Sequence, residues 1–433
     1  MSSELCKIKE LYKLFVQFPF ISTDTRTLKP KSLFFCLKGE NFDGNLFVND
    51  ALEKGARYVI TDNKDLPKSK SIIVVDNVLQ TLQQLANYHR QQINIPIIGI
   101  SGTNGKTTTK ELITSVLSKK YKTAATQGNL NNHIGVPLTL LSIKQEDEIA
   151  IVEMGANHVG EIAELCQIAL PNYAIITNIG KAHLEGFGNI ENIIETKTAL
   201  YHAAQTLFVN GEDKVLMQKA EPFSIKNRHL MTEEEKQVVL YGKDTEVSGR
   251  ILRMTPCLEI ELLGNKVQTQ LTGNYNLPNI LAAAAIGRYF NVSNEDICDA
   301  IAEYVPQNNR SQIIIKNANT IIADYYNANP TSMIAALENF ILIDASNKVA
   351  ILGDMFELGE NSMAEHQTII DFCELHHLET LFIGSNFFTL KNERSHFFIN
   401  LQDCNDYLKN NKIENTFLLI KGSRGVHLEN VKL

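Results

Sequence analysis

Strand-like and helix-like hydrophobic patterns alternate along most of the chain. Short runs of β-branched and other apolar residues at Ile95–Ile100, Glu148–Met154 and Tyr173–Thr177 are typical of buried strands, and a helical pattern follows each of them. A further helix is expected over Leu79–His89. Because strands alternate with helices, the pattern predicts an α/β fold with parallel sheets covered by helices.

The same alternation restarts near residue 310 and runs to the end of the chain. It predicts a separate doubly wound, Rossmann-like unit, in which no G-x-G-x-x-G fingerprint supports dinucleotide binding. The strands expected there are Thr320–Asp324, Val349–Gly353, Thr380–Gly384 and Thr416–Lys421, and the helices are Thr331–Ile343, Ser362–Leu375 and Asp403–Lys409. With 433 residues, we expect three domains at 1–92, 93–310 and 311–433.

Composition narrows the class of protein. Hydrophobic residues make up 44% and charged residues 21%, which excludes a wholly disordered chain, and no apolar run approaches the length of about 18 residues that a membrane insertion needs. A net charge of −8 argues against nucleic-acid binding. Seven cysteines without a C-x-x-C pair indicate free thiols, so we expect a cytoplasmic protein, with a monomer as the default.

Charge is uneven along the chain. Residues 1–92 carry 13 Lys and Arg against 10 Asp and Glu, whereas the remainder is acidic. A mildly basic first domain favours an anionic ligand, but chance variation on a solvated surface explains the charge equally well.

The strongest local motif is a phosphate-binding loop between an expected strand and an expected helix over Lys110–Lys119. Its glycines allow backbone N–H groups to surround phosphate oxygens, Lys106 can reach the β- and γ-phosphates, and the Thr107 hydroxyl can ligate Mg²⁺. Ile100 stands where the usual motif has glycine, so a glycine-rich turn with an incidental lysine is the alternative. The residues expected at the phosphates are Gly102, Thr103, Asn104, Gly105, Lys106, Thr107 and Thr108.

Three further residues lie downstream of this loop. Glu153 lies near the end of one expected strand and His183 just past the end of another, where ligands collect in parallel sheets, so Glu153 can bind or orient Mg²⁺. A solvated glutamate and a structural histidine are the alternatives. Lys197 falls in an expected helix over Glu191–Tyr201 and by its pattern alone would be a surface lysine.

Other short motifs extend over nearly the whole chain. They are Ser22–Arg26, Leu33–Gly39, Gly128–Pro137, Glu153–Ala156, Thr177–Glu185, Gly273–Asn279, Asn309–Arg310, Asp324–Pro330, Leu352–Gly359 and Lys421–Arg424. This series resembles the Mur ligases, ATP-dependent amide-forming enzymes of peptidoglycan precursor synthesis. Tyr275 and Asn45 depart from it, because the family often has histidine at both positions.

The resemblance implies roles for the candidates. The loop, Asn279, Arg310 and Asp324 would bind ATP, and the central domain would be an ATPase-like domain. Thr107 and Glu153 would ligate one Mg²⁺, and His183 and Lys197 would lie at a second. The lysine at the Lys197 position is commonly carbamylated in this family, which would make it an anionic oxygen ligand. The implied catalytic residues are Lys106, Glu153, His183 and Lys197.

The resemblance also implies the substrates. Tyr-Asn-Ala-Asn-Pro and Gly-Asp-Met-x-Glu-Leu-Gly are similar to signatures of the members that add D-Ala-D-Ala to UDP-MurNAc-tripeptide through an acyl phosphate. The implied substrate contacts are Ser22, Thr23, Asp24, Arg26, Lys38 and Gly39 for the UDP part, Asn129, Asn131 and Asn132 in the centre, and Asn327, Asn329, Ser423 and Arg424 for D-Ala-D-Ala. Asn329-Pro330 also fits a helix N-cap followed by a first-turn proline.

Several alternatives stay open at this point. The nearest are a ligase that adds the third residue of the peptide and a folylpolyglutamate-type synthase. A regulatory P-loop NTPase is a different class, but Asn63-Lys64-Asp65-Leu66 does not match the N-K-x-D motif that reads guanine. A non-catalytic nucleotide-binding scaffold is disfavoured because the matched catalytic positions are intact.

Overall fold

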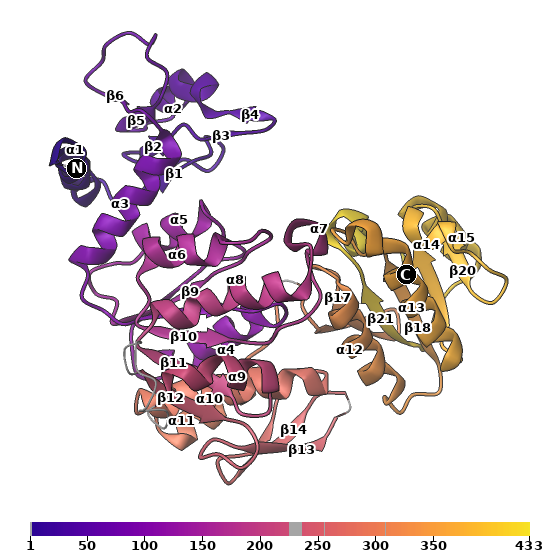
Figure 1. The fold of residues 1–433 in the computed structure, drawn as a ribbon. Coiled ribbons are helices and arrows are strands. Elements are labelled where there is room, and N and C mark those ends of the chain that lie inside the picture. Colours follow the sequence, from indigo (N-terminus) through magenta and orange to yellow (C-terminus); the bar gives the residue numbers. More distant parts are fainter. Residues whose placement is uncertain (1, 225–235, 255, 308) are drawn as a thin grey trace.

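The computed structural model describes residues 2–224, 236–254, 256–307 and 309–433, and its elements form three successive sheet-based units (Figure 1). The predicted α/β class and the three-domain organisation are confirmed. We propose the division 1–92, 93–310 and 311–433 for the three domains. The first two connect between Gln92 and Ile97, and the third begins its sheet at Gln312.

The N-terminal domain is built on a small parallel sheet with the order β1-β2-β5-β6. Phe34 and Val59 pack on one face of the sheet, whereas Leu33, Phe35 and Ile60 join the core on the other. Its elements are α1 Ser2–Gln17, β1 Ile21–Ser22, β2 Leu33–Phe35, β3 Lys38–Gly39, β4 Phe42–Asp43, α2 Val48–Glu53, β5 Tyr58–Thr61, β6 Ile72–Val74 and α3 Val78–Gln92.

Helix α3 joins the first two domains, as Figure 1 shows. Asn77 caps its start by accepting a hydrogen bond from the backbone N–H of Gln80 at 2.8 Å. Leu82 and Leu85 are fully buried in the core cluster that also contains Leu140 and Leu165 of the central domain. The N-terminal domain is therefore anchored to the central one through a continuous apolar core.

The central domain has an all-parallel sheet with the order β12-β11-β10-β7-β9-β8. Along β9, Ile149 and Ile151 face one core while Ala150 and Val152 face the other, which is the period of two expected for a strand covered on both sides. The elements up to β12 are β7 Ile97–Ser101, α4 Lys106–Ser118, β8 Thr123–Ala125, α5 Gly135–Leu141, β9 Ile149–Glu153, α6 Glu161–Ala169, β10 Tyr173–Ile176, α7 Leu184–Phe187, α8 Ile190–Ala203, β11 Thr206–Asn210, α9 Lys214–Ala220 and β12 Gln237–Tyr241.

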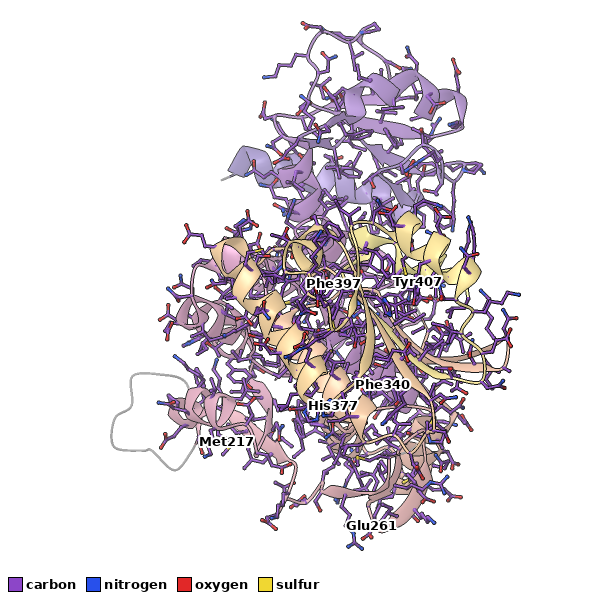
Figure 2. The ribbon with its side chains drawn as sticks, turned by 90° about the vertical axis from the view of Figure 1, so that its right-hand side faces the viewer. Met217, Glu261, Phe340, His377, Phe397 and Tyr407 are labelled. Carbon is purple, nitrogen blue, oxygen red and sulfur yellow. The ribbon has the colours of Figure 1, made fainter. Side chains whose placement is uncertain are left out.

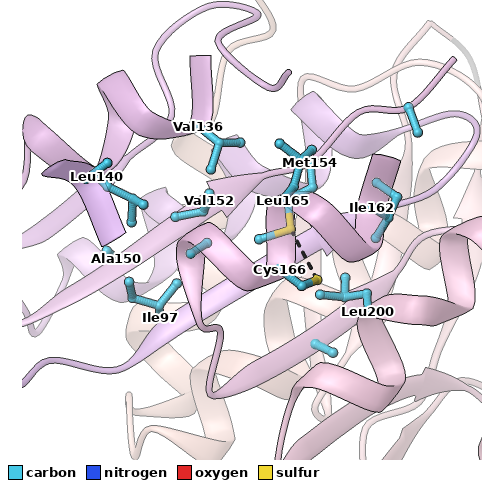
Figure 3. Packing of buried hydrophobic residues seen from close by; sticks show 14 of the residues in the cluster. Ile97, Val136, Leu140, Ala150, Val152, Met154, Ile162, Leu165, Cys166 and Leu200 are labelled. Carbon is cyan, nitrogen blue, oxygen red and sulfur yellow. Dashed lines mark hydrogen bonds between the residues drawn. The ribbon is translucent and has the colours of Figure 1, made fainter. Parts of the chain in front are cut away.

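One face of this sheet packs on α5, α6 and α8. Figure 3 shows Ile97, Ala150, Val152 and Met154 of the sheet side packed against residues of these helices, with the Met154 and Cys166 sulfurs 3.9 Å apart. The opposite face packs on α4 and on α10, where buried alanines allow close approach.

The sequence pattern missed a small antiparallel sheet, β13-β14-β15, in the central domain. β13 has no buried residue, and polar or charged residues separate the single buried ones of β14 and β15, so no long apolar run marks these strands. The remaining central elements are β13 Gly249–Arg253, β14 Glu259–Leu262, β15 Asn265–Gln268, α10 Leu277–Tyr289 and α11 Asn294–Glu303.

The C-terminal domain has a six-stranded sheet with the order β16-β17-β21-β18-β19-β20, and only the edge strand β16 is antiparallel. Helices cover both faces, and Figure 2 shows Phe340 and Phe397 within this unit. Its elements are β16 Gln312–Lys316, β17 Asn319–Asp324, α12 Pro330–Ile341, β18 Lys348–Gly353, α13 Ser362–Leu375, β19 Glu379–Ile383, α14 Ser385–Thr389, β20 His396–Phe398, α15 Leu401–Asn410 and β21 Phe417–Lys421. None of the helices in the described ranges combines the length and apolar character needed to cross a membrane.

Arg90 ties the end of α3 to the central domain. Its guanidinium donates to the carbonyl oxygens of Ala169, at 3.1 Å, and Leu170, and to Asn172 Oδ1 at 2.8 Å. The side chain is buried, so its removal would leave these acceptors unpaired away from water.

We therefore expect Arg90→Ala to lower the free energy of the first urea unfolding transition by about 3 kcal/mol. Arg250→Ala is the matched control, because Arg250 makes an exposed 2.7 Å ion pair with Glu261, the residue at the lower end of the molecule in Figure 2. The free energy of unfolding that Arg250→Ala loses should stay below about 1 kcal/mol. Equal losses in the two variants would contradict the anchoring role of Arg90.

Candidate active site

A cavity of about 860 Å³ lies where the central and C-terminal domains meet, and α3 contributes to its wall. The carboxyl ends of β7, β9 and β10 open onto it from one side, and those of β17 and β21 from the other. Ligands of open α/β sheets bind at this edge because loops and helix N-termini converge there.

The loop that follows β7 has a fixed shape. Gly102 and Gly105 adopt positive φ angles of 140° and 78°, and a Cβ on Gly102 would lie 2.0 Å from Thr177 Oγ1. The backbone N–H groups of Thr103 and Asn104 donate to Asn178, at 2.9 Å and 3.0 Å. Glycine is therefore required, and the neighbouring strand end holds the loop in place.

Lys106 begins α4 and folds back over this loop. Its ammonium donates to the carbonyl oxygens of Gly102, at 2.7 Å, and Thr103, at 3.0 Å. The pKa of Lys106 is lowered to about 8, because burial lowers it, Glu153 partly offsets this, and the Arg310 charge adds to the lowering. An anion bound at the loop would stabilise the charged amine.

Glu153 ends β9 and is almost completely buried, so the interpretation as a solvated strand-end residue is wrong. Its carboxylate accepts hydrogen bonds from Thr107 Oγ1 at 3.0 Å and from Asn131 Nδ2 at 2.8 Å. A hydroxyl and a carboxylate are hard oxygen donors that fit Mg²⁺. Across the described ranges, no three His, Cys, Asp or Glu side chains gather as a metal cluster, so nucleotide and water oxygens would complete this site.

Lys197 lies on α8, behind the loop. It is 2% exposed and donates to the Gly102 carbonyl oxygen at 3.1 Å, so the surface-lysine interpretation is also wrong. Burial lowers the pKa of Lys197 well below its ordinary range, and the nearby Lys106 lowers it further. A neutral amine is the form of lysine that reacts with electrophiles.

His183 joins the central domain to the C-terminal one. It has a positive φ of 50°, and its Nδ1 contacts the carboxylate of Glu357, whose φ is also positive at 61°. Hydrogen bonding to His183 lowers the pKa of Glu357. Lys181 and Glu365 form a second ion pair across the same boundary at 2.9 Å.

Asn329 connects the loop to the C-terminal domain. It caps α12 in a capping box with Ser332, as its sequence predicts. Its Nδ2 also donates to Asn104 Oδ1 at 2.8 Å. The residue therefore has a structural role and a place at the cavity at the same time.

Asn279, Arg310 and Asp324 also line the cavity. The Thr109 hydroxyl donates to Asn279 Oδ1 at 3.0 Å, and a Cβ on Gly105 would lie 2.8 Å from the same oxygen. Asp324 accepts a 2.6 Å hydrogen bond from Lys421, which ends the neighbouring strand.

Comparison with known proteins fits this geometry. Residues 17–98 match the model described as "Mur ligase family, catalytic domain", residues 100–287 the "Mur ligase middle domain", and residues 309–424 the "Mur ligase, glutamate ligase domain". The UDP-N-acetylmuramoyl-tripeptide–D-alanyl-D-alanine ligase of Bacillus subtilis is 33% identical over 95% of this chain and 92% of its own length. The chain belongs to the Mur ligase family.

Solved structures agree with this assignment. MurF from Acinetobacter baumannii superposes with a TM-score of 0.84 at 31% identity, covering 95% of this chain and 92% of that one. MurF from Thermotoga maritima, solved in complex with ADP, has a TM-score of 0.81 at 25% identity, with 95% and 96% covered.

This Mur ligase brings most of its predicted site residues to one cavity. Those that line it are Thr103, Asn104, Gly105, Lys106, Thr107, Thr108, Asn129, Asn131, Asn132, Glu153, His183, Asn279, Arg310, Asp324, Asn327 and Asn329. Gly102 belongs to the loop itself, and Lys197 lies behind it and donates to the Gly102 carbonyl oxygen. Ser423 is buried, and its hydroxyl accepts from the Phe356 N–H at 3.0 Å.

The residues expected at the UDP part lie in the N-terminal domain. Ser22, Thr23 and Asp24 line a separate cavity of about 250 Å³, which Leu138 of the central domain also borders. Arg26 pairs with Asp24 and lowers the Asp24 pKa to about 2, while Lys38 pairs with Asp62 at 3.0 Å. Arg26, Lys38 and Gly39 line neither this cavity nor the larger one.

Among the cavity residues to which the sequence assigned no role, Lys421 and Tyr326 contact predicted site residues. Lys421 could have been found, because it ends a strand adjacent to the one that ends in Asp324. No sequence pattern singles out Tyr326 for this role. Its contact with Arg310 forms only when the fold brings the end of a strand next to the connection between the domains.

The pKa of Lys106 generates a prediction. A bound polyanion favours the charged amine and raises its pKa, so binding takes up a proton where the empty site is partly neutral. Near pH 8 we expect ATP binding to take up about half a proton, and affinity to fall as the pH rises through 8. Calorimetry in buffers of different ionisation enthalpy measures the uptake. Lys106→Met should abolish it, and uptake that persists in that variant would assign the proton to another group.

Proposed function

We propose that this Mur ligase joins D-Ala-D-Ala to UDP-MurNAc-tripeptide with ATP, giving UDP-MurNAc-pentapeptide, ADP and phosphate. The observation that carries the proposal is the full-length match to D-alanyl-D-alanine ligases, together with the Tyr-Asn-Ala-Asn-Pro segment facing the phosphate loop across one cavity. The ADP complex of the Thermotoga maritima relative supports ATP as the nucleotide. Function in the cytoplasm as a monomer is part of the proposal.

The phosphates of ATP occupy the loop. The first residues of α4 line this space, where its free N-terminal N–H groups can bind phosphate, and Lys106 turns from the loop carbonyls to the phosphate oxygens. Arg310 and Asn279 line the same cavity. Thr107 and Glu153 would hold Mg²⁺, which when bound offsets negative charge on the transferring phosphoryl group.

The chemistry has two steps. A carboxylate oxygen of the tripeptide forms a bond to the γ-phosphorus while the bond to the ADP oxygen breaks, and Lys106 and Arg310 stabilise the charge on the group in flight. The amine of D-Ala-D-Ala then attacks the acyl carbon. Its nitrogen loses a proton, the carbon–oxygen bond to phosphate breaks, and an amide and inorganic phosphate result.

Contacts between the domains protect this intermediate. The Asn104–Asn329 and His183–Glu357 contacts hold the C-terminal domain against the central one beside the loop. An acyl phosphate hydrolyses in water, so a closed cavity favours attack by the bound amine.

The substrates would reach this point from opposite domains. The UDP end lies at Ser22, Thr23 and Asp24, and α3 residues Leu79 and Gln83 carry the wall from that domain into the reaction cavity. The residues proposed for the peptide and for D-Ala-D-Ala are Asn129, Asn131, Asn132, Asn327, Asn329, Ser423 and Arg424.

Carbamylation of Lys197 is also part of the proposal. The buried amine, whose pKa is lowered by burial, can add to CO₂ with loss of a proton, and the resulting carbamate oxygens and His183 would hold a second Mg²⁺. We expect Lys197→Ala to lower ligation at least 100-fold while the thermal midpoint stays within a few degrees of wild type. An NMR carbamate signal from ¹³C-bicarbonate, absent in the variant, would support the modification. Unchanged ligation in Lys197→Ala would exclude the role.

The direct test is ligation by the purified full chain with ATP, Mg²⁺ and UDP-MurNAc-tripeptide. We expect phosphate release and a pentapeptide mass with D-Ala-D-Ala, and neither with diaminopimelate, lysine or glutamate as the amine. Because the tripeptide can carry either diaminopimelate or lysine, both are assayed. Product from UDP-MurNAc-dipeptide and a diamino acid would indicate the third-residue ligase instead. Phosphate release without any amine would indicate a regulatory NTPase.

A further inference from the structure

The large cavity holds two cations, Lys106 and Arg310, that form no direct ion pair with the carboxylates lining it in the described part of the chain. Four carboxylates line it: Glu153, Glu161, Glu164 and Asp324. Within the described part of the chain, none of them forms an ion pair with Lys106 or Arg310. Asp324 is occupied by Lys421, and Glu153 by Thr107 and Asn131.

Arg310 is therefore positioned by an aromatic ring and not by a carboxylate. Its guanidinium carbon lies 3.9 Å from the centre of the Tyr326 ring, which is a close cation–π contact. The Nε atom of Arg310 is buried and has no hydrogen-bond partner among the described residues. The Arg424 guanidinium lies 5.7 Å from the same ring.

The position of Tyr326 follows from the sheet. Strand β17 ends at Asp324 beside Lys421 of β21, and the chain then crosses the cavity edge. Tyr325 packs into the core on one face of the sheet, whereas Tyr326 lines the cavity. The two neighbouring tyrosines therefore lie in different environments, one against the core and one at the cavity.

We propose that Tyr326 is a positioning residue that holds the Arg310 guanidinium ready for the nucleotide phosphates by stacking on it. The role rests on the proposed function, because it needs ATP as the anion. A guanidinium that is already held loses less conformational freedom when the anion binds, and its N–H groups stay free to donate. The ring, and not its hydroxyl, carries this effect.

Nucleotide affinity of the full chain, measured by calorimetry with ATP and Mg²⁺, tests the proposal. Tyr326→Leu should weaken binding about tenfold, the scale of a partly buried cation–π contact, while Tyr326→Phe stays within about twofold of wild type. Tyr325→Leu is the matched control and should leave affinity unchanged, because that ring faces the core and not the cavity.

A double-mutant cycle separates positioning from an independent contact. In an Arg310→Ala background, Tyr326→Leu should cause no further loss of ATP affinity. A full additional tenfold loss there would overturn the proposal, as would a Tyr326→Phe loss equal to that of Tyr326→Leu, which would assign the effect to the hydroxyl. Unchanged affinity in Tyr326→Leu would overturn it directly.

Two further measurements separate a loss of ATP affinity from misfolding of the variant and from failure of the proposed ligase function. Thermal melting checks that Tyr326→Leu folds, and Tyr326→Met, which keeps volume without a ring, replaces it if it does not. Ligation by the wild-type chain is assayed separately. Nucleotide binding needs neither the tripeptide nor D-Ala-D-Ala, so a failed ligation would count against the proposed function alone, and an unaltered ATP affinity against the role of Tyr326 alone.

Discussion

Lys106 and Arg310 bring positive charge into one cavity, and among the described residues neither forms a direct ion pair there. Holding a partly buried cation without a direct ion pair is costly, so other contacts position these two groups. Loop carbonyls hold Lys106, and an aromatic ring holds Arg310. A bound polyphosphate lowers the free-energy cost of holding these two cations, and this favours nucleotide binding in the cavity.

The rest of the architecture serves this charge arrangement. Parallel strands of two sheets end at the same cavity, so residues far apart in the chain converge there. Glu153 ends β9, and Lys421 ends β21. Helix α3 shares a core with the central domain, so the proposed UDP site keeps a fixed relation to the loop. The ligase chemistry requires this convergence, because donor, nucleotide and amine must meet away from water.

Much of this was predictable from sequence. The spacing of apolar residues predicted β7, β9, β18 and the helices that cover them. Glycines and a lysine directly after a strand predicted the phosphate-binding loop. The burial of Lys197 was not predictable from its pattern, because lysine on a helix is usually exposed. The β13-β14-β15 sheet was missed because charged residues interrupt its apolar positions. The Arg310–Tyr326 contact depends on tertiary placement of the inter-domain connection, which no local pattern encodes.

The most direct test of this account is how nucleotide affinity depends on phosphate number. Calorimetry with the wild-type chain would compare ATP, ADP and AMP in the presence of Mg²⁺. If binding is driven by contacts of the phosphates with Lys106 and Arg310, AMP should bind at least about 100-fold more weakly than ATP, because at least two charge-assisted contacts are lost. Equal affinity for AMP and ATP would show that the base and sugar carry the binding, and would contradict the account.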